Sequence, residues 1–396
     1  MAGIDGAQVN QLLERAAQGG AVPGAIAMAA DRDGVTYSGA AGVLSVDGDQ
    51  PARIDTMLRI ASMTKPITSV AVLQLIEQRR LELEQTVASV LPEFGDLKVL
   101  EGFDGDRPRL REPRRPATIH HLLTHTSGLA YWFGNADMTR YHELTGTPTP
   151  LSFDRGFLAA PMIEDPGVRW EYGISTDWLG QVVEAISGQG LDAYFAEHVL
   201  GPLGMTDTTF TPSSAQRERM MALHARTPDG GLTLSDLDWP PDPGMWCGGH
   251  GLFSTPVDYL RLQRALLAGG ELDGARVLEP ESVDLAFSNQ IGDIEPPTFL
   301  ASAEPALSND IHALPGIEQR WGLGFHLVME DVPGARRAGT GDWSGLTNCY
   351  FWIDRASGVT AALYTQLLPF FDERMVELAM GFEQAVYAGA AVTTPA

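Results

Sequence analysis

Ser62 and Lys65 are three residues apart in the segment ASMTKP, residues 61–66. At the start of a helix, residues i and i+3 lie one turn apart on the same face, so the hydroxyl and the amine are expected to touch. A serine hydroxyl is a weak nucleophile until a base removes its proton, and a lysine in a dry site can be that base. The free N–H groups at the start of the helix also stabilise an oxyanion. Four residues therefore supply a nucleophile, a base and part of an oxyanion hole.

The lysine at position 65 carries information because the chain has only two lysines, Lys65 and Lys98, beside twenty-five arginines. A lysine gives up its proton in a suitable site, whereas an arginine effectively does not. Two simpler explanations stay open. Lys65 is a chance survivor in a sequence biased toward arginine codons, or the segment is a surface helix start with a capping serine and a solvated lysine. The Ser-x-x-Lys spacing alone favours the surface helix, because it occurs by chance in many proteins.

The helix that carries Lys65 is predicted to run from about Ser62 to Arg80. Pro66 has no N–H and is tolerated only in the first turn, which places the helix start at about Ser62 or Met63. The residues beyond Pro66 are apolar almost all round, a pattern typical of a buried helix. A buried helix, a register fixed by Pro66 and the scarcity of lysine together favour the catalytic interpretation.

The sheet strands are predicted at both ends of the chain. A helix over residues 7–17 precedes two strands around a turn at Asp31 to Gly34. Three more strands are expected within 322–330, 347–354 and 359–367, closed by a helix over 372–387. We therefore predict an α/β fold of the α+β type, with an antiparallel sheet built from N- and C-terminal strands and flanked by helices.

The middle of the chain is predicted to be an insertion into this sheet. Residues 117–245 are proline-rich and mostly helical or irregular, and the polar segments 100–116 and 288–318 are expected to be surface loops. The α/β body is predicted to contain residues 1–85 and 246–396, and the inserted helical region residues 86–245. The active site is expected between them.

Composition limits the partners of this protein. With 44% hydrophobic and 20% charged residues the chain is typical of soluble globular proteins. A net charge of −24 argues against nucleic acid and anionic membranes as partners, so a small molecule is expected. The N-terminus lacks the basic and apolar regions of a signal peptide, which predicts a cytoplasmic location. Two cysteines form no disulfide framework, no cofactor is predicted, and the oligomeric state is left unknown.

A second proton-transfer group is expected in WEYGISTDWLG, residues 170–180. Tyr172 stands just before an apolar helix and can point its hydroxyl into a cleft, although composition alone favours a core tyrosine. His120, His121 and His125 have a zinc-like spacing, but no HExxH motif or obvious third ligand accompanies them, and no metal is predicted.

Several segments resemble the serine β-lactamase-like superfamily, and specifically the family VIII carboxylesterases related to class C β-lactamases. The resemblance covers nearly the whole chain, and Ser-x-x-Lys is a motif of these hydrolases. The most specific segment is TIHHLLTHTSGL, residues 118–129. The other matching segments are VPGAIAMAADRDG (22–34), LRIASMTKPITSVAVLQLIEQRRLEL (58–83), GGHGLFSTPVDYLRL (248–262), WGLGF (321–325) and YTQLLPF (364–370).

The resemblance implies that Ser62 is the acylated nucleophile, Lys65 the general base and Tyr172 the tyrosine that shares proton transfer. The tyrosine motif departs from the lactamase form, because Ile174 stands where lactamases have asparagine. In this the chain resembles a subset of the esterases that has an aliphatic residue at this position. That subset also has an aspartate at the position of Asp177, five residues after the tyrosine.

The Lys-Thr-Gly motif of lactamases is absent, and Trp343-Ser344-Gly345 resembles the Trp-Gly-Gly of the esterases in its place. By this alignment the backbone N–H of Leu346 joins that of Ser62 in the oxyanion hole. Trp343 offers an apolar face where lactamases grip a carboxylate, which suits a neutral ester. The predicted substrate pocket contains Tyr131, Trp132, Asp177, Trp343, Ser344, Gly345, Gly248 and Gly249; the glycines are expected to allow close approach of the backbone.

We therefore predict a serine carboxylesterase that hydrolyses or transfers short acyl groups through a Ser62 acyl-enzyme. A β-lactamase, D-peptidase or amidase with the same acyl-enzyme is the second interpretation, and the two missing lactamase motifs count against it. An inactive penicillin-recognising protein that only binds is the third, and the intact Ser62, Lys65 and Tyr172 argue against it. The natural ester is not identified by the sequence.

Overall fold

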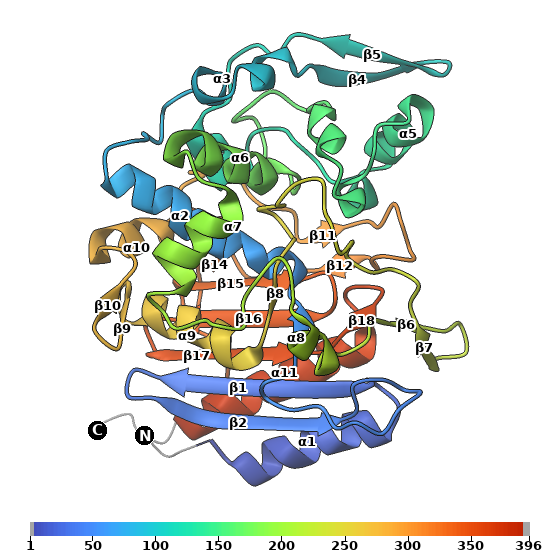
Figure 1. Ribbon diagram of the computed structural model, residues 1–396, viewed down its shortest axis with the longest axis vertical. Coiled ribbons are helices and arrows are strands. Elements are labelled where there is room, and N and C mark those ends of the chain that lie inside the picture. Colours follow the sequence, from blue (N-terminus) through green and yellow to red (C-terminus); the bar gives the residue numbers. More distant parts are fainter. Residues whose placement is uncertain (1–3, 391–396) are drawn as a thin grey trace.

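A computed structural model describes residues 4–390 of the chain, and its centre is a seven-stranded sheet. The strand order is β13–β14–β15–β16–β17–β1–β2, and neighbouring strands are antiparallel. β1 and β2 come from the N-terminal part and the other five from the C-terminal part (Figure 1), so the predicted fold class is confirmed. The strands are β1 (Gly24–Asp31), β2 (Val35–Gly42), β13 (Gln319–Trp321), β14 (His326–Val328), β15 (Thr340–Gly345), β16 (Cys349–Asp354) and β17 (Val359–Tyr364).

The pairing of β1 with β17 joins the N-terminal and C-terminal strands of the sheet. The register runs from Ile26 opposite Tyr364 to Asp31 opposite Val359. Nearly every residue of both strands is buried, and their sequences are continuous runs of small and apolar residues. Such runs are typical of strands that are covered on both faces.

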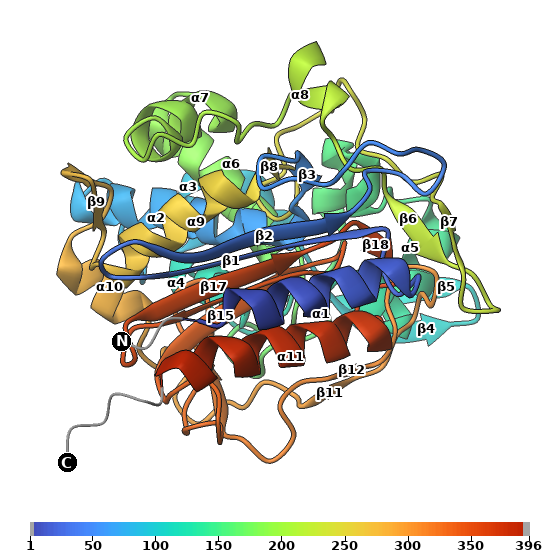
Figure 2. The same cartoon turned by 90° about the horizontal axis from the view of Figure 1, so that it is seen from below.

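Helices α1 (Gly6–Gln18) and α11 (Glu373–Ala390) cover one face of the sheet side by side (Figure 2). The side chain of Asp5 accepts hydrogen bonds from the N–H groups of Ala7 and Gln8 and so caps the start of α1. Val9, Leu13 and Phe382 are buried against the sheet in one apolar cluster. The predicted helices over 7–17 and 372–387 are confirmed within the usual uncertainty at helix ends.

Helices α2 (Thr64–Glu77) and α9 (Pro256–Leu267) lie on the opposite face of the sheet (Figure 2). Every residue of α2 from Thr64 to Leu75 is buried, as its apolar sequence predicts. Pro66 lies in the first turn, directly after a short 3-10 helix over Ala61–Met63. On α9, the buried amide of Gln263 donates to the hydroxyl of Thr360 and ties this helix to β17.

The region 86–245 is less helical than expected. The segment 100–116 contains a hairpin of β4 (Val99–Asp104) and β5 (Arg107–Arg111), so the prediction of a surface loop was wrong there. Most of β5 is exposed, so the hairpin has no regular apolar alternation that would reveal it in the sequence. The guanidinium of Arg111 binds the carboxylate of Asp165 through two hydrogen bonds, at 2.7 and 2.9 Å, and anchors the hairpin. The division of the chain into a body and an insertion stays a prediction.

Short elements connect these layers. The remaining helices are α3 (Val87–Val90), α4 (Ile119–Leu123), α5 (Ala136–Thr145), α6 (Ser175–Ser187), α7 (Leu191–Phe195), α8 (Ser214–Glu218) and α10 (Pro280–Ala286). The remaining strands are β3 (Leu58–Arg59), β6 (His224–Arg226), β7 (Leu232–Leu234), β8 (Phe253–Ser254), β9 (Glu271–Leu272), β10 (Ala275–Arg276), β11 (Phe299–Leu300), β12 (Ile311–His312) and β18 (Leu367–Leu368). Within residues 4–390, no helix has both the length and the apolar character needed to cross a bilayer.

Replacement of Phe382 by alanine is expected to destabilise the fold strongly. The Phe382 side chain is fully buried between the rings of Tyr37 and Trp352, and its removal leaves a cavity worth about 3–5 kcal/mol of unfolding free energy. Met380→Ala on the same helix is the control, because this side chain is 57% exposed and its loss costs less than about 0.5 kcal/mol. Urea denaturation of both variants measures the difference, and equal stabilities would contradict this packing.

Candidate active site

The Ser62 hydroxyl is presented by a strained turn. Ser62 lies in the 3-10 helix before α2, and the preceding Ala61 has a φ of 44°. Non-glycine residues seldom adopt this left-handed conformation, which costs on the order of 1–3 kcal/mol and is frequent at functional sites. The end of β15 packs closely on this turn, because a Cβ on Gly345 would collide with the carbonyl oxygen of Ile60. Gly345 therefore brings the strand end up to the serine.

Lys65 is 1% exposed, and its amine touches three oxygen atoms. Nζ lies 3.2 Å from Oγ of Ser62, 3.1 Å from the hydroxyl of Tyr131 and 2.8 Å from the carbonyl oxygen of Gly249. The contact with Ser62 is the one that the spacing of the two residues predicts. The contacts with Tyr131 and Gly249 come from distant parts of the chain.

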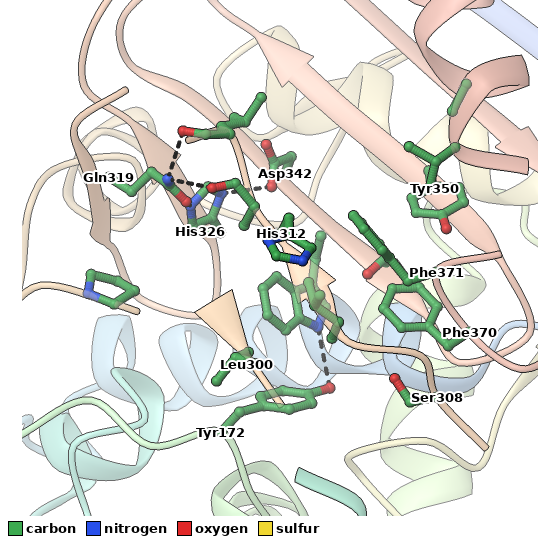
Figure 3. A pocket seen from close by; sticks show the side chains of 18 of the residues that line it. Tyr172, Leu300, Ser308, His312, Gln319, His326, Asp342, Tyr350, Phe370 and Phe371 are labelled. Carbon is green, nitrogen blue, oxygen red and sulfur yellow. Dashed lines mark hydrogen bonds and ion pairs between the residues drawn. The ribbon is translucent and has the colours of Figure 1, made fainter. Parts of the chain in front are cut away.

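Tyr172 approaches Ser62 from the loop before α6. Its hydroxyl lies 2.7 Å from Oγ of Ser62 and accepts a hydrogen bond of 3.3 Å from the indole N–H of Trp343. Figure 3 draws this hydrogen bond as the dashed line that ends at the hydroxyl of Tyr172. Ser62, Lys65 and Tyr172 are thus brought into one cluster, with two groups that can exchange protons with the serine hydroxyl.

The segment 118–129 holds the loop of Tyr172 in place. The N–H of Glu171 donates to the carbonyl of His125 at 2.7 Å, and the N–H of Tyr131 donates to the carbonyl of Tyr172 at 3.0 Å. The buried ring of His125 packs at 5.2 Å from the ring of Tyr172. The pKa of His125 lies well below its usual value, mainly because the ring is buried and to a smaller extent because the charge of Lys65 is near. This histidine therefore stays neutral.

The strand end of the predicted oxyanion hole is the part of β15 beyond its pairing with β14. β14 pairs only with residues 340–342 of β15, so the strand end at Trp343 to Gly345 pairs only with β16. Leu346 follows directly and shares the walls of two adjoining cavities with Ser62. The arrangement fits a hole made by the backbone N–H groups of Ser62 and Leu346, and this assignment stays a prediction.

A cavity of about 470 Å³ opens in front of Ser62 and Tyr172 (Figure 3). Its walls are mainly apolar and aromatic, and the segment 296–315 contributes Leu300, Ser308 and His312. At one end His326 bridges Gln319 and Asp342, with contacts of 2.8 Å at each ring nitrogen. A smaller cavity of about 20 Å³ adjoins Ser62. It is lined by Ala61, Ser62, Tyr131, Trp132, Phe133, Pro150, Leu151, Trp239, His250 and Leu346.

The residues of the predicted substrate pocket fall into three places. Tyr131, Trp343 and Ser344 line the large cavity, and Trp132 lines the small one. Gly345 packs against Ile60 at the nucleophile turn. Asp177, Gly248 and Gly249 are buried behind Lys65 and are not among the residues that line these cavities.

Asp177 is the centre of a buried polar group behind Lys65. Its carboxylate accepts a hydrogen bond of 2.9 Å from the N–H of Gly249 and one of 3.4 Å from the hydroxyl of Tyr131. Burial pushes the pKa of Asp177 upward, but His250, Lys65 and the Gly249 N–H outweigh it and hold the pKa below its usual value. Burial, followed by the charge of Asp177, raises the pKa of Tyr131 well above its usual value.

Asp177, Cys247 and His250 also bring three possible metal-ligand atoms within 4.8 Å of one another. Their atoms already have other roles. Asp177 receives the Gly249 N–H, and Nε2 of His250 lies 3.1 Å from the carbonyl of Pro150. Burial, and then the charge of Asp177, raises the pKa of the Cys247 thiol well above its usual value, which disfavours the thiolate that a metal needs. We therefore interpret this group as the support of Lys65.

Two features of the site were missed by sequence reasoning. The first is the contact of Tyr131 and Gly249 with the amine of Lys65, which joins residues 66 and 184 positions away from it. The second is the network of His326, Asp342 and Arg336 at the end of the cavity. No local motif marks either one, because each joins separate elements. The sequence did place Tyr131, Asp177 and Gly249 in the predicted substrate pocket, but it gave no sign of their contacts with Lys65 or with one another.

Comparisons with known proteins identify the family of this chain. The family model described as Beta-lactamase matches residues 9–381. Monacolin J acid methylbutanoyltransferase from Aspergillus terreus is 34% identical over 393 residues, which covers 93% of this chain and 92% of that protein. Lovastatin esterase from Penicillium rubens is 32% identical over 388 residues, which covers 93% of this chain and 95% of that protein.

Solved structures give the same picture. A mutant of simvastatin synthase from Aspergillus terreus matches with a TM-score of 0.85 and 32% identity, and the match covers 98% of each chain. EstCE1, a hydrolase with promiscuous acyltransferase activity, matches in fold with a TM-score of 0.77 at 22% identity, over 96% of this chain and 98% of that one. These relatives include acyltransferases and esterases. Since the family model spans most of the sequence, the chain belongs to the beta-lactamase family.

Proposed function

We propose that this protein is a serine esterase and acyltransferase that acts through an acyl-enzyme on Ser62. The observation that carries the proposal is the position of the Ser62 hydroxyl. It lies 3.2 Å from the amine of Lys65 and 2.7 Å from the phenol of Tyr172, at the wall of a largely apolar cavity. Both distances allow direct proton transfer to or from the serine.

In the first half-reaction, Oγ of Ser62 attacks the carbonyl carbon of an ester, and its proton passes to Lys65. The negative charge that develops on the carbonyl oxygen is stabilised by the backbone N–H groups of Ser62 and Leu346. Tyr172 passes a proton to the departing alcohol, which completes acylation. The indole N–H of Trp343 donates a hydrogen bond to the Tyr172 oxygen and fixes its position. The Tyr172 proton itself remains available to Ser62 or to the leaving group.

In the second half-reaction, a hydroxyl group enters where the alcohol left and attacks the acyl-enzyme while its proton passes to the Tyr172 oxygen. The bond between Oγ of Ser62 and the acyl carbon then breaks, and Lys65 returns its proton to Oγ. Water yields the free acid, and a second alcohol yields a new ester by acyl transfer. The same three residues serve both outcomes, because only the incoming nucleophile differs. The names of the relatives fit this scheme, since they include a methylbutanoyltransferase and an esterase.

The two cavities suggest how the ester is oriented. The small cavity of about 20 Å³ has room for roughly the last one or two carbon atoms of an acyl chain, since a water-sized group needs roughly 10–15 Å³. It suits a short acyl chain. The large cavity suits a bulky, mainly apolar alcohol, with a few polar groups to orient it. We assign the acyl group to the small cavity and the alcohol to the large one.

Trp343 distinguishes this site from one built for β-lactams. The strand beside Ser62 carries Trp343-Ser344-Gly345 and no lysine, so it offers an indole instead of a cation to the substrate. A neutral ester needs no cationic partner, whereas a β-lactam carboxylate does. The site therefore favours esterase activity over β-lactamase activity.

Incubation with p-nitrophenyl butyrate and with nitrocefin tests the proposed reaction. We expect turnover of the ester, little turnover of nitrocefin, and loss of ester turnover in Ser62→Ala by at least about 10³-fold, because the nucleophile is gone. Mass spectrometry after rapid quenching should find the butanoyl group on the wild-type protein alone. Dominant nitrocefin turnover would support a β-lactamase, and absence of an adduct with either compound would support a protein that only binds.

Lys65→Arg is expected to lower kcat by about 10²–10⁴-fold, because arginine keeps the charge but does not act as a base. Lys98→Arg is the matched control. Lys98 is the other lysine of the chain and forms an exposed ion pair of 2.6 Å with Glu112, so this variant should keep wild-type activity. An active Lys65→Arg enzyme would show that Lys65 is not the base.

Leu151→Ala is expected to shift the enzyme toward longer acyl chains. Leu151 lines the small cavity, and its truncation makes room for about one or two further methylene groups. The ratio of kcat/KM for p-nitrophenyl hexanoate over butyrate should rise by roughly 10-fold or more. Leu144→Ala, at a side chain that is 38% exposed, should leave the ratio unchanged. If Leu151→Ala also leaves the ratio unchanged, the acyl group lies elsewhere.

A further inference from the structure

We propose that Tyr131 and Asp177 form a positioning pair that directs the amine of Lys65 toward Ser62. Neither residue touches the reacting atoms of the substrate in this scheme. Both act through Lys65, so the inference rests on the proposed role of Lys65 as the base. It explains why Lys65 exchanges its proton with Ser62 and not with its other two oxygen neighbours.

The argument begins with the three oxygen neighbours of Nζ. A lysine nitrogen has one bond to Cε and three further tetrahedral positions, each filled by a hydrogen or a lone pair. The three neighbours are Oγ of Ser62, the hydroxyl of Tyr131 and the carbonyl of Gly249. Each neighbour therefore takes one position, and the chemistry depends on which position exchanges its proton.

The carbonyl of Gly249 can only accept a hydrogen bond, so its position on the nitrogen always holds an N–H. The contact is the shortest of the three, at 2.8 Å. Its place is fixed from the other side, because the N–H of the same residue donates to Oδ1 of Asp177 at 2.9 Å. A Cβ at residue 249 would press on the Asp177 carboxylate, which explains the need for glycine here.

The hydroxyl of Tyr131 can in principle donate or accept, and Asp177 removes this choice. Oδ2 of Asp177 accepts from the Tyr131 hydroxyl at 3.4 Å, which leaves a lone pair of the phenol oxygen for an N–H of Lys65. The raised pKa of Tyr131, caused by burial and then by the charge of Asp177, keeps the phenol protonated. Asp177 is itself fully buried and ionised, so it acts as a permanent acceptor.

The third position on the nitrogen therefore always faces Ser62. When the amine is neutral, its lone pair points at Oγ and takes the serine proton. After transfer, the new N–H points back along the same line. Four other titratable side chains lie near the amine of Lys65 or the carboxylate of Asp177, namely Tyr172, His125, Cys247 and His250.

Asp177→Asn tests this inference because the amide has nearly the same shape as the carboxylate. Its oxygen is expected to stay on the N–H of Gly249, beside His250, so its NH₂ group faces Tyr131. The phenol must then accept from the amide and donate to the lone pair of Lys65. We expect kcat to fall by about 30-fold or more with little change in KM. The lone pair of Lys65 then accepts a hydrogen bond from Tyr131, so it is no longer available to take the proton of Ser62.

Tyr131→Phe supplies the second arm of a double-mutant cycle. This variant removes the hydroxyl that would be reversed, so Asp177→Asn should lower kcat by less than about threefold in the Tyr131→Phe background. Tyr131→Phe alone should cost only about 3- to 10-fold, since the amine loses one acceptor but gains no competitor. An Asp177→Asn loss of equal size in both backgrounds would mean that Asp177 only supports the structure, and would overturn the inference.

If Asp177→Asn does not fold by circular dichroism, Tyr131→Phe decides alone, and a loss above about 10³-fold or no loss would contradict a positioning role. Activity that persists in Ser62→Ala or Lys65→Arg would instead contradict the proposed function itself.

Discussion

The buried contact between the amine of Lys65 and the hydroxyl of Ser62 is the constraint on which the rest of the site depends. An amine with 1% exposure must have polar partners, because an unpaired buried group is costly. Helix α2 is buried on all sides and cannot turn the lysine toward water. The surroundings therefore supply oxygen atoms from Tyr131 and Gly249, and these in turn require the carboxylate of Asp177 behind them.

The sheet contributes the end of β15 to this arrangement. β15 loses its partner β14 after residue 342, and the free strand end reaches Ser62 because Gly345 has no side chain. Trp343 and Leu346 line the same cavity as Ser62, and Trp343 holds Tyr172 while Leu346 completes the proposed oxyanion hole. A paired edge at this point would close the cavity, so the short length of β14 is part of the site.

The cavity can vary without any change in the proposed proton transfer, which fits a family whose members include acyltransferases and an esterase. The proposed chemistry is confined to a few atoms around Ser62, whereas much of the cavity wall comes from the segment 296–315, strands β13 to β16 and helix α11. Loops of this kind can change without moving Lys65, Tyr172 or the strand end. In the proposed scheme, the shape of the cavity then decides which nucleophile reaches the acyl-enzyme.

The sequence by itself determined helices α1, α2 and α11, five of the seven strands of the central sheet (β1, β2, β14, β16 and β17) and the pairing of Ser62 with Lys65. These features depend on local rules: the apolar pattern of α2, the position of Pro66, the hairpin at residues 24–42 and the i, i+3 spacing. Motif resemblance then selected Tyr172 and the strand at Trp343. Only the tertiary structure decided that Asp177 lies behind the lysine, that Tyr131 binds the amine, and that residues 99–111 form a hairpin. These facts depend on contacts between distant segments, and neither periodicity nor spacing within one segment records such contacts.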